Sequence, residues 1–284
     1  MAEQEVVTQE EEAPALSGLL AVLGFVLGAV IGAAAGLIGV GGGEFRIPVL
    51  LHVLRLPVKV AAGVNMVVGL CTVVLGVVRR WGQQEWTTDD IAVAGVMAVA
   101  SVFGAVIGAR QASRFSSPFL KIVVCVYLVA VGVWMVVEAV AHAEIVLLAP
   151  AGAGRWVLAA VVGFVVAAVS GALGVAGGEM RITALLYLFA LPVKEAGTIS
   201  LLVSVPTVAS GAVAYRRLGY VPNRVLLVAA LMGVGSLLGV LAGASLLPFM
   251  DKHTLKGLLG VILLVATVCL TLPGFIKGKG NGQG

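Results

Sequence analysis

Long unbroken runs of apolar residues constrain the fold of this chain most strongly. Examples are the runs from Leu16 to Val40 and from Ile122 to Val137. Neither run has the period-two alternation of a transmembrane β-strand, so both are interpreted as helices. Only 11% of the 284 residues are charged and the mean hydropathy is +1.12, whereas a soluble domain carries about a quarter charged residues. We therefore predict an all-α integral membrane protein.

An internal repeat emerges when the sequence is shifted by 135 residues against itself. Residues 39–76 then align with residues 174–211, and 18 of these 38 positions are identical. The motifs Gly-Gly-Glu-x-Arg-Ile and Leu-Pro-Val-Lys match in one register, which chance similarity between apolar segments does not produce. Such self-similarity indicates a repeat architecture. We predict two pseudo-symmetric repeats of five helices each, over residues 16–142 and 156–272.

Ten helical segments follow from the apolar runs and their glycine and proline boundaries. They cover residues 16–40, 45–55, 60–80, 88–110 and 119–141 in the first repeat, and residues 156–175, 180–190, 195–215, 224–247 and 254–272 in the second. An acidic tail over residues 1–15 is expected to be disordered. Residues 143–155 form the predicted linker and residues 273–284 a C-terminal tail.

The second helix of each repeat is too short to cross a bilayer. About eleven residues separate the Gly-Gly-Glu motif from the Leu-Pro-Val-Lys turn, which gives roughly 16 Å at 1.5 Å per residue. That is about half of the hydrocarbon core. Counting Lys and Arg in the loops does not decide between parallel and inverted repeats. We favour inverted repeats because paired short, glycine-interrupted segments typify inverted-repeat transporters.

The candidate binding site lies at the two glycine-rich breaks that precede these short helices. Gly41, Gly42 and Gly43 form the first break, and Gly177 and Gly178 belong to its copy. Glycine permits unusual φ values and close approach to the backbone. The free N–H groups and positive dipole end of a new helix attract anions. The alternative is that these glycines only let helices cross closely.

Four charged residues stand beside the breaks, namely Glu44, Arg46, Glu179 and Arg181. A charge at the bilayer centre costs roughly 2.5 to 3.5 kcal/mol on the insertion scale, so such groups are expected to be paired or used. We expect the arginines to hold an oxyanion by bidentate hydrogen bonds, with the glutamates paired to them across the pseudo-twofold axis. A glutamate that carries a coupling proton is one alternative, and purely structural Glu–Arg salt bridges are another.

Polar residues on the third helices complete the candidate site. Asn65 and Ser200 occupy equivalent positions early in these helices, and Thr72 and Thr207 follow two turns later. Hydrogen bonding between helices is an equally good explanation for such side chains.

Several functional classes have no support in the sequence. His52, His142 and His253 are scattered and no H-E-x-x-H or Cys/His cluster exists, so neither a metal site nor a cofactor is expected. We find no nucleophile and base pair and no phosphate-binding loop, so we expect neither an enzyme nor an ATPase. The basic residues stand singly or in pairs at the ends of apolar runs, which is typical of topology determinants and not of a nucleic-acid surface.

The doubled motif resembles the TauE/SafE family of sulfite and organosulfonate exporters over about residues 16–272. The resemblance rests on two glycine-rich breaks, each followed by a short apolar helix, a Leu-Pro-Val turn and a third helix with small polar residues. It implies that the glycines at the breaks carry the motif's role, and that Asn65 and Ser200 match its small polar position. The chain departs from the family by carrying Glu and Arg after the glycines, by Ala176 in place of glycine and by Thr183 in place of proline.

The resemblance implies an ATP-independent carrier in the bacterial cytoplasmic membrane for sulfite, thiosulfate, sulfoacetate or a related anion. Alternating access around a midplane site between the repeats is the expected mechanism. An anion channel with a pore between two opposed half-helices is the alternative. Expected partners are the anion, the lipid bilayer and a coupling proton or cation, in a monomer or a homodimer.

Overall fold

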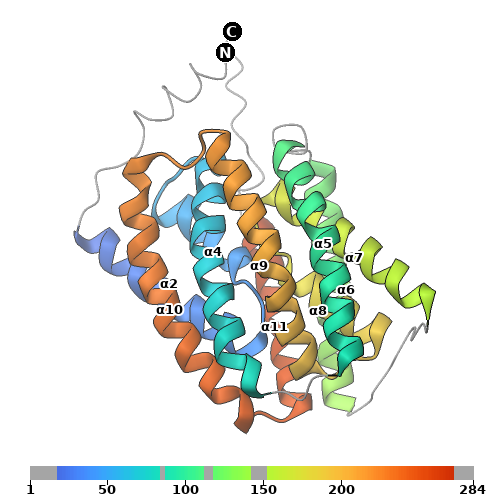
Figure 1. The fold of residues 1–284 in the computed structure, drawn as a ribbon. Helices are drawn as coiled ribbons and strands as arrows, with labels where there is room; N and C mark the ends of the chain where they lie inside the picture. The colour runs from blue at the N-terminus through green and yellow to red at the C-terminus, as the bar shows by residue number, and fades with distance from the viewer. Residues whose placement is uncertain (1–17, 84–86, 112–117, 142–151, 272–284) are drawn as a thin grey trace.

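The computed structural model describes residues 18–83, 87–111, 118–141 and 152–271, and within them it contains ten α-helices and no strand (Figure 1). These helices are α2 Gly18–Ile38, α3 Gly43–Pro48, α4 Val58–Arg80, α5 Thr88–Gln111, α6 Pro118–Ala141, α7 Ala153–Leu173, α8 Gly178–Phe189, α9 Val193–Arg217, α10 Leu226–Leu246 and α11 Lys252–Thr271. Each of the ten predicted segments corresponds to one of them. Both predicted tails and most of the predicted linker lie outside the described residues.

Five of the helices, α4, α5, α7, α9 and α10, are long and apolar enough to cross a membrane. Large apolar side chains also cover the outside of the bundle, such as Phe103 at 62% exposure and Val140 at 76%. A soluble monomer rarely exposes a continuous apolar surface of this kind. The outer faces of these helices therefore meet lipid.

Glycines let α2 approach α10 closely along its length. Gly28 lies against Met232, and Gly36 lies against Val240, where an added β-carbon would meet the carbonyl oxygen. Because the contacts advance in the same direction along both helices, α2 and α10 are parallel. Such packing through small residues is typical of helices in membranes.

A second parallel pair joins α5 to α7 through Gly104, Gly108, Gly163 and Gly171. In Figure 1 the α2–α10 pair and the α5–α7 pair flank the central helices α4 and α9. The described residues form three hydrophobic clusters, which are built mainly from Val, Leu, Ile, Ala and Met.

Two other helix pairs run antiparallel. On α4 and α9, Gly76 lies against Leu201, whereas Met66 lies against Gly211. Helices α6 and α11 also contact each other with opposed directions, since Gly132 lies against Leu264 and Ala139 against Gly257. In each of these pairs the two helices occupy the same position in their halves of the chain, third and fifth respectively.

The two short helices begin and end in similar ways. Gly42 and Gly177 precede them with φ angles of 68° and 67°, in the left-handed region that favours glycine. At the other end, Arg55 and Ala190 take φ angles of 51° and 58°, which stops each helix before the following proline.

The first short helix differs from the regular helix predicted over residues 45–55. Its α-helical part ends at Pro48, and residues Val49–Val53 form a π-helix in which the amide of Leu54 donates to the carbonyl of Val49. Pro48 has no N–H to donate to the carbonyl of Glu44, which interrupts the i to i−4 ladder. Wider turns of this type occur where that ladder is broken.

Candidate functional site

The two glycine-rich breaks lie against each other in the interior of the protein. A β-carbon added at Gly178 would lie 2.9 Å from Cα of Val40, and one at Gly43 would lie 3.4 Å from Cα of Val175. Gly41 faces the methyl group of Ala176. Two segments that are far apart in the sequence thus bring the first turns of α3 and α8 together.

Arg46 on α3 is fully buried and is held by two side chains of α4. Its Nη1 donates to Oδ1 of Asn65 at 3.0 Å, and its Nη2 donates to Oγ1 of Thr72 at 3.2 Å. Asn65 in turn donates to the carbonyl of Gly174 at 2.6 Å, across the contact between the breaks. Nε of Arg46 has no hydrogen-bond partner among the described residues.

Arg181 on α8 is equally buried but is held by one nitrogen only. Nη1 donates to the backbone carbonyl of Ser200 at 3.1 Å and to Oγ of Ser204 at 2.6 Å. Its Nη2 and Nε have no hydrogen-bond partner within the described part of the chain. The hydroxyl of Ser200 donates to the carbonyl of Gly178 at 3.2 Å, so this serine stabilises the break itself.

Glu44 and Glu179 are the second residues of α3 and α8, and their side chains are 4% and 1% exposed. The two carboxyl groups interact electrostatically across the contact between the breaks. One oxygen of each group, Oε2 of Glu44 and Oε1 of Glu179, lacks a hydrogen-bond partner in the described structure. An acidic residue in the first turn also suits the positive end of the helix dipole.

The expected Glu–Arg ion pairs are not formed. Ion pairs of the described residues, such as Arg155 with Asp89 and Lys256 with Glu138, lie away from the breaks. The two arginines instead donate hydrogen bonds to polar groups of α4 and α9. Among the described residues, neither guanidinium group therefore has a carboxylate within ion-pair distance, although both groups interact electrostatically with the nearby glutamates.

Comparison with protein families assigns the chain directly, since the family model described as sulfite exporter TauE/SafE matches residues 23–270. The chain belongs to the sulfite exporter TauE/SafE family. Members of this family are transporters and not enzymes, so this TauE/SafE protein is an integral membrane transporter. Comparison with curated proteins and with solved structures yields no match.

Two site residues of this TauE/SafE protein were not found in the sequence. Ser204, which binds Arg181, aligns with Gly69 of the first repeat, so the repeat carries no signal for it. Arg80 ends α4, is fully buried and donates to the carbonyl of Lys194 at 2.9 Å. It follows Arg79 at the end of an apolar run, a position that predicts a loop residue. The hydroxyl of Thr207 donates to the carbonyl of Val203, whereas the hydroxyl of Thr72 accepts a hydrogen bond from Arg46.

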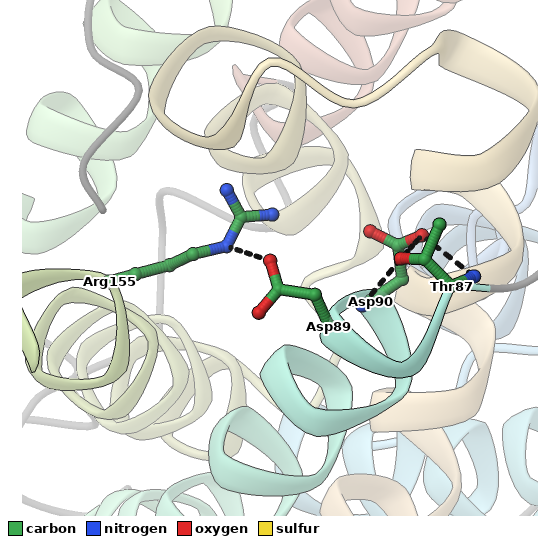
Figure 2. A network of polar contacts seen from close by, with 4 residues as sticks. All are labelled: Thr87, Asp89, Asp90 and Arg155. Atoms are coloured by element: carbon green, nitrogen blue, oxygen red, sulfur yellow. Dashed lines mark hydrogen bonds and ion pairs between the residues drawn. The ribbon is translucent and has the colours of Figure 1, made fainter. Parts of the chain in front are cut away.

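Polar groups away from the breaks secure helix ends. Figure 2 shows Thr87 and Asp90 in a capping box at the start of α5, where the hydroxyl of Thr87 donates to Oδ2 of Asp90 at 2.5 Å and accepts from the amide of Asp90 at 3.2 Å. The same figure shows the ion pair between Nε of Arg155 and Oδ2 of Asp89 at 3.0 Å, which joins α7 to α5.

The start of α11 is secured in two ways. Oδ1 of Asp251 accepts hydrogen bonds from the amides of His253 and Thr254, both at 2.9 Å. Hydrogen bonds from Thr254 lower the pKa of Asp251. One turn later, Lys256 pairs with Glu138 of α6 at 2.7 Å, and Glu138 accepts a hydrogen bond from the hydroxyl of Tyr187 at 2.7 Å. These contacts secure helix ends and lie outside the candidate site.

The two arginines give the breaks groups that can bind an oxyanion. Within the described residues no three His, Cys, Asp or Glu side chains lie close enough together to hold a metal ion. The guanidinium group is a planar set of N–H donors that matches the geometry of oxyanions. Three nitrogens of Arg46 and Arg181 still have hydrogen-bonding capacity, which makes these two residues the strongest ligand-binding groups of the breaks.

Proposed function

We propose that this TauE/SafE protein is a secondary transporter for a small sulfur-containing oxyanion, such as sulfite, thiosulfate or an organosulfonate like sulfoacetate, in the cytoplasmic membrane. One observation carries the proposal. Two fully buried arginines, one at each glycine-rich break, have guanidinium nitrogens that lack hydrogen-bond partners among the described residues, and no described carboxylate lies within ion-pair distance of them. An unpaired buried charge is costly, and an anion that binds there removes the cost.

The breaks supply further groups for such an anion. Gly41, Gly42 and Gly43, with Gly177 and Gly178, lie at or just before the first turns of α3 and α8, where helix dipoles favour negative charge. Asn65 positions Arg46 in the first half of the chain, and Ser200 stabilises the glycine-rich break in the second half. A sulfonate or sulfite group offers several oxygen acceptors on one sulfur, so it can bind the donors of both arginines at once.

We propose two inverted repeats, over residues 16–142 and 156–272, as the basis of alternating access. The antiparallel packing of α4 with α9 and of α6 with α11 supports inversion, because these helices hold the same positions in the two sequence repeats. Parallel repeats would give parallel partners. The close-packed pairs α2–α10 and α5–α7 are then two rigid bodies that move about the breaks and open the site to either side.

Burial of the site favours this carrier mechanism over an anion channel with a pore between the half-helices. Both arginines have no exposed surface, so the described conformation is closed at the breaks. A carrier passes through such an occluded state in every cycle, and its flux saturates with anion concentration. Flux through an open channel that rises linearly with concentration would contradict the carrier proposal.

Ligand-induced stabilisation of the purified protein tests the proposed function. Sulfite, thiosulfate, sulfoacetate, sulfate, acetate and chloride are added separately to the protein in detergent, and its thermal unfolding is followed. A ligand at 100 times its dissociation constant stabilises the folded state by about 2.7 kcal/mol. We expect stabilisation by sulfur oxyanions that disappears in the Arg46→Ala, Arg181→Ala double variant.

The exposed Arg79 provides a matched control, because Arg79→Ala removes an arginine of α4 that binds Ser245 away from the breaks. This variant should respond to the anions like the parent protein. Equal stabilisation of the parent and the double variant would contradict an anion site at the arginines. Stabilisation by none of the anions would contradict the proposed substrate class.

A further inference from the structure

We infer that Arg80 forms a second anion-binding site, which lies beside the first glycine-rich break and at one end of the central helices only. The ligand is a small oxyanion of the class that Arg46 and Arg181 bind. The inference rests on the proposed function, because it adds a binding stage for the same anion on its way to these two arginines.

The guanidinium group of Arg80 is fully buried and mostly unused. Its Nη2 donates to the carbonyl of Lys194 at 2.9 Å. Its Nε and Nη1 have no hydrogen-bond partner among the described residues, and no carboxylate that the structure describes lies within ion-pair distance. A buried charge with unsatisfied donors is costly, and an anion that binds there removes the cost.

Two glycines from distant parts of the chain make room for this guanidinium group. A β-carbon added at Gly39, directly after α2, would lie 2.5 Å from Nη1 of Arg80. One added at Gly197, in the second turn of α9, would lie 2.9 Å from Nη2 and 3.2 Å from Nη1. A side chain at either position would displace the guanidinium group. The fold therefore places this charge between the start of the first break and the start of α9.

A purely structural role explains only part of this arrangement. The hydrogen bond from Arg80 to Lys194 joins the end of α4 to the first turn of α9. That bond uses a single nitrogen, so it gives no reason for a buried guanidinium group with two further nitrogens lacking partners within the described part of the chain. An oxyanion accepts hydrogen bonds from such N–H groups and also neutralises their charge.

Arg80 lies too far along α4 to belong to the central site. Thr72 of α4 holds Arg46, and Arg80 follows it by eight residues, which is about 12 Å along the helix at 1.5 Å per residue. The chain that passes the guanidinium group at Gly39 continues through the first break to Arg46. An anion that leaves Arg80 along this segment therefore arrives at the central arginines.

The second half of the chain has no such group at the equivalent place. Tyr215 stands in the position of Arg80 when the sequence is shifted by 135 residues. It is buried and uncharged, and its hydroxyl donates to the carbonyl of Gly171 at 3.1 Å. Ala62 takes the place of Gly197, so one of the two glycines is missing as well. The proposed site is thus a single one, which gives two anions for each protein molecule when the central site is also filled.

Counting bound anions tests the inference. Radiolabelled thiosulfate and radiolabelled sulfite are used as separate probes in equilibrium dialysis of the purified protein in detergent. With the probe that binds, we expect two anions for each molecule of the parent protein and one for Arg80→Gln. The Arg46→Ala, Arg181→Ala double variant should also bind one, since it keeps Arg80.

Two control variants should still bind two anions. Arg79→Gln removes the neighbouring arginine of α4, which is exposed and binds Ser245. Tyr215→Phe alters the buried residue that is equivalent to Arg80 without changing its charge. If Arg80→Gln fails to fold, Arg80→Lys replaces it. Lysine keeps the charge but loses the planar set of donors, so one of the two sites should bind about tenfold more weakly.

The outcomes separate this inference from the proposed function. Two anions on Arg80→Gln, or unchanged affinities in Arg80→Lys, would show that Arg80 has a structural role only and would overturn the inference. One anion on the parent protein that is lost in the double variant would overturn the Arg80 site and leave the proposed function intact. If the double variant binds as many anions as the parent and Arg80→Gln binds fewer, the Arg80 site stands and the proposed central site is contradicted.

Discussion

The two glycine-rich breaks share one sequence motif but hold their arginines differently. In the first, Arg46 uses both terminal nitrogens on the side chains of Asn65 and Thr72. In the second, Arg181 makes both of its hydrogen bonds through Nη1, so the N–H groups of Nη2 and Nε have no partner among the described residues. The duplicated motif thus places an arginine in each break, but the third helix of each half decides how many donors remain for a ligand.

The helices after the breaks differ as well. In the first, Pro48 interrupts the hydrogen-bond ladder and a π-helix follows. In the second, Thr183 takes the equivalent position, donates its hydroxyl to the carbonyl of Glu179 at 2.6 Å, and α8 remains a regular helix of 12 residues. The second half is therefore the more regular scaffold and holds the arginine with more free donors. We infer that Arg181 contributes more to anion binding than Arg46.

The largest expected effect separates the two arginines directly. Arg181→Ala should weaken anion binding by about a thousandfold, because it removes two free donors to a charged ligand at about 2 kcal/mol each. Arg46→Ala, which removes one free donor, should weaken binding by only about 10- to 30-fold. Isothermal titration of a stabilising anion from the panel measures both affinities. Equal losses in the two variants would break the proposed asymmetry.

A proline introduced into the second half tests the difference in helix shape. Thr183→Pro should lower the free energy of unfolding by about 3 kcal/mol, because it removes a backbone donor inside α8 and clashes with the preceding turn. Denaturant titration in mixed micelles measures this change. Thr183→Val is the control that removes only the hydroxyl bond, at about 1 kcal/mol. A proline variant as stable as the parent would show that α8 readily takes the shape of the first half.

The equivalent residues Asn65 and Ser200 should differ in their effect on stability. Asn65→Ala leaves both Nη1 of Arg46 and the carbonyl of Gly174 without their partner, at a cost of about 2 kcal/mol. Ser200→Ala removes only a hydroxyl bond, since Arg181 binds the backbone carbonyl, and it should cost about 1 kcal/mol or less. The same unfolding titration compares the two, and a larger loss for Ser200→Ala would contradict the difference in anchoring.

The smallest effect is expected where the two halves agree. Arg55 and Ala190 both have left-handed backbone angles, which cost a residue with a side chain roughly 1 to 2 kcal/mol. Glycine relieves this strain but loses more entropy on folding. Arg55→Gly and Ala190→Gly should therefore each raise stability by about 0.5 kcal/mol in thermal unfolding. A gain at one position and a clear loss at the other would show that the two helix ends differ after all.

Much of the architecture was readable from the sequence. The apolar runs predict the ten helices, because a segment inside a bilayer must satisfy its backbone within itself. Glycine and proline predict where the short helices begin and end, because their backbone preferences are local. The exception is the π-helix over Val49–Val53. It follows Pro48, which lies beyond the first turn of the helix and interrupts the i to i−4 hydrogen bonds of its backbone. The two-repeat arrangement of the domains stays a prediction.

The sequence by itself determined that this chain is a membrane-embedded helical protein with a duplicated glycine-rich break and four charges beside it. Only the tertiary structure decided how the arginines are held: Arg46 binds Asn65 and Thr72, and Arg181 binds Ser204 and the backbone of Ser200. The physical reason is that hydropathy and backbone preference are properties of neighbouring residues, whereas the partner of a buried charge depends on how helices from distant parts of the chain cross.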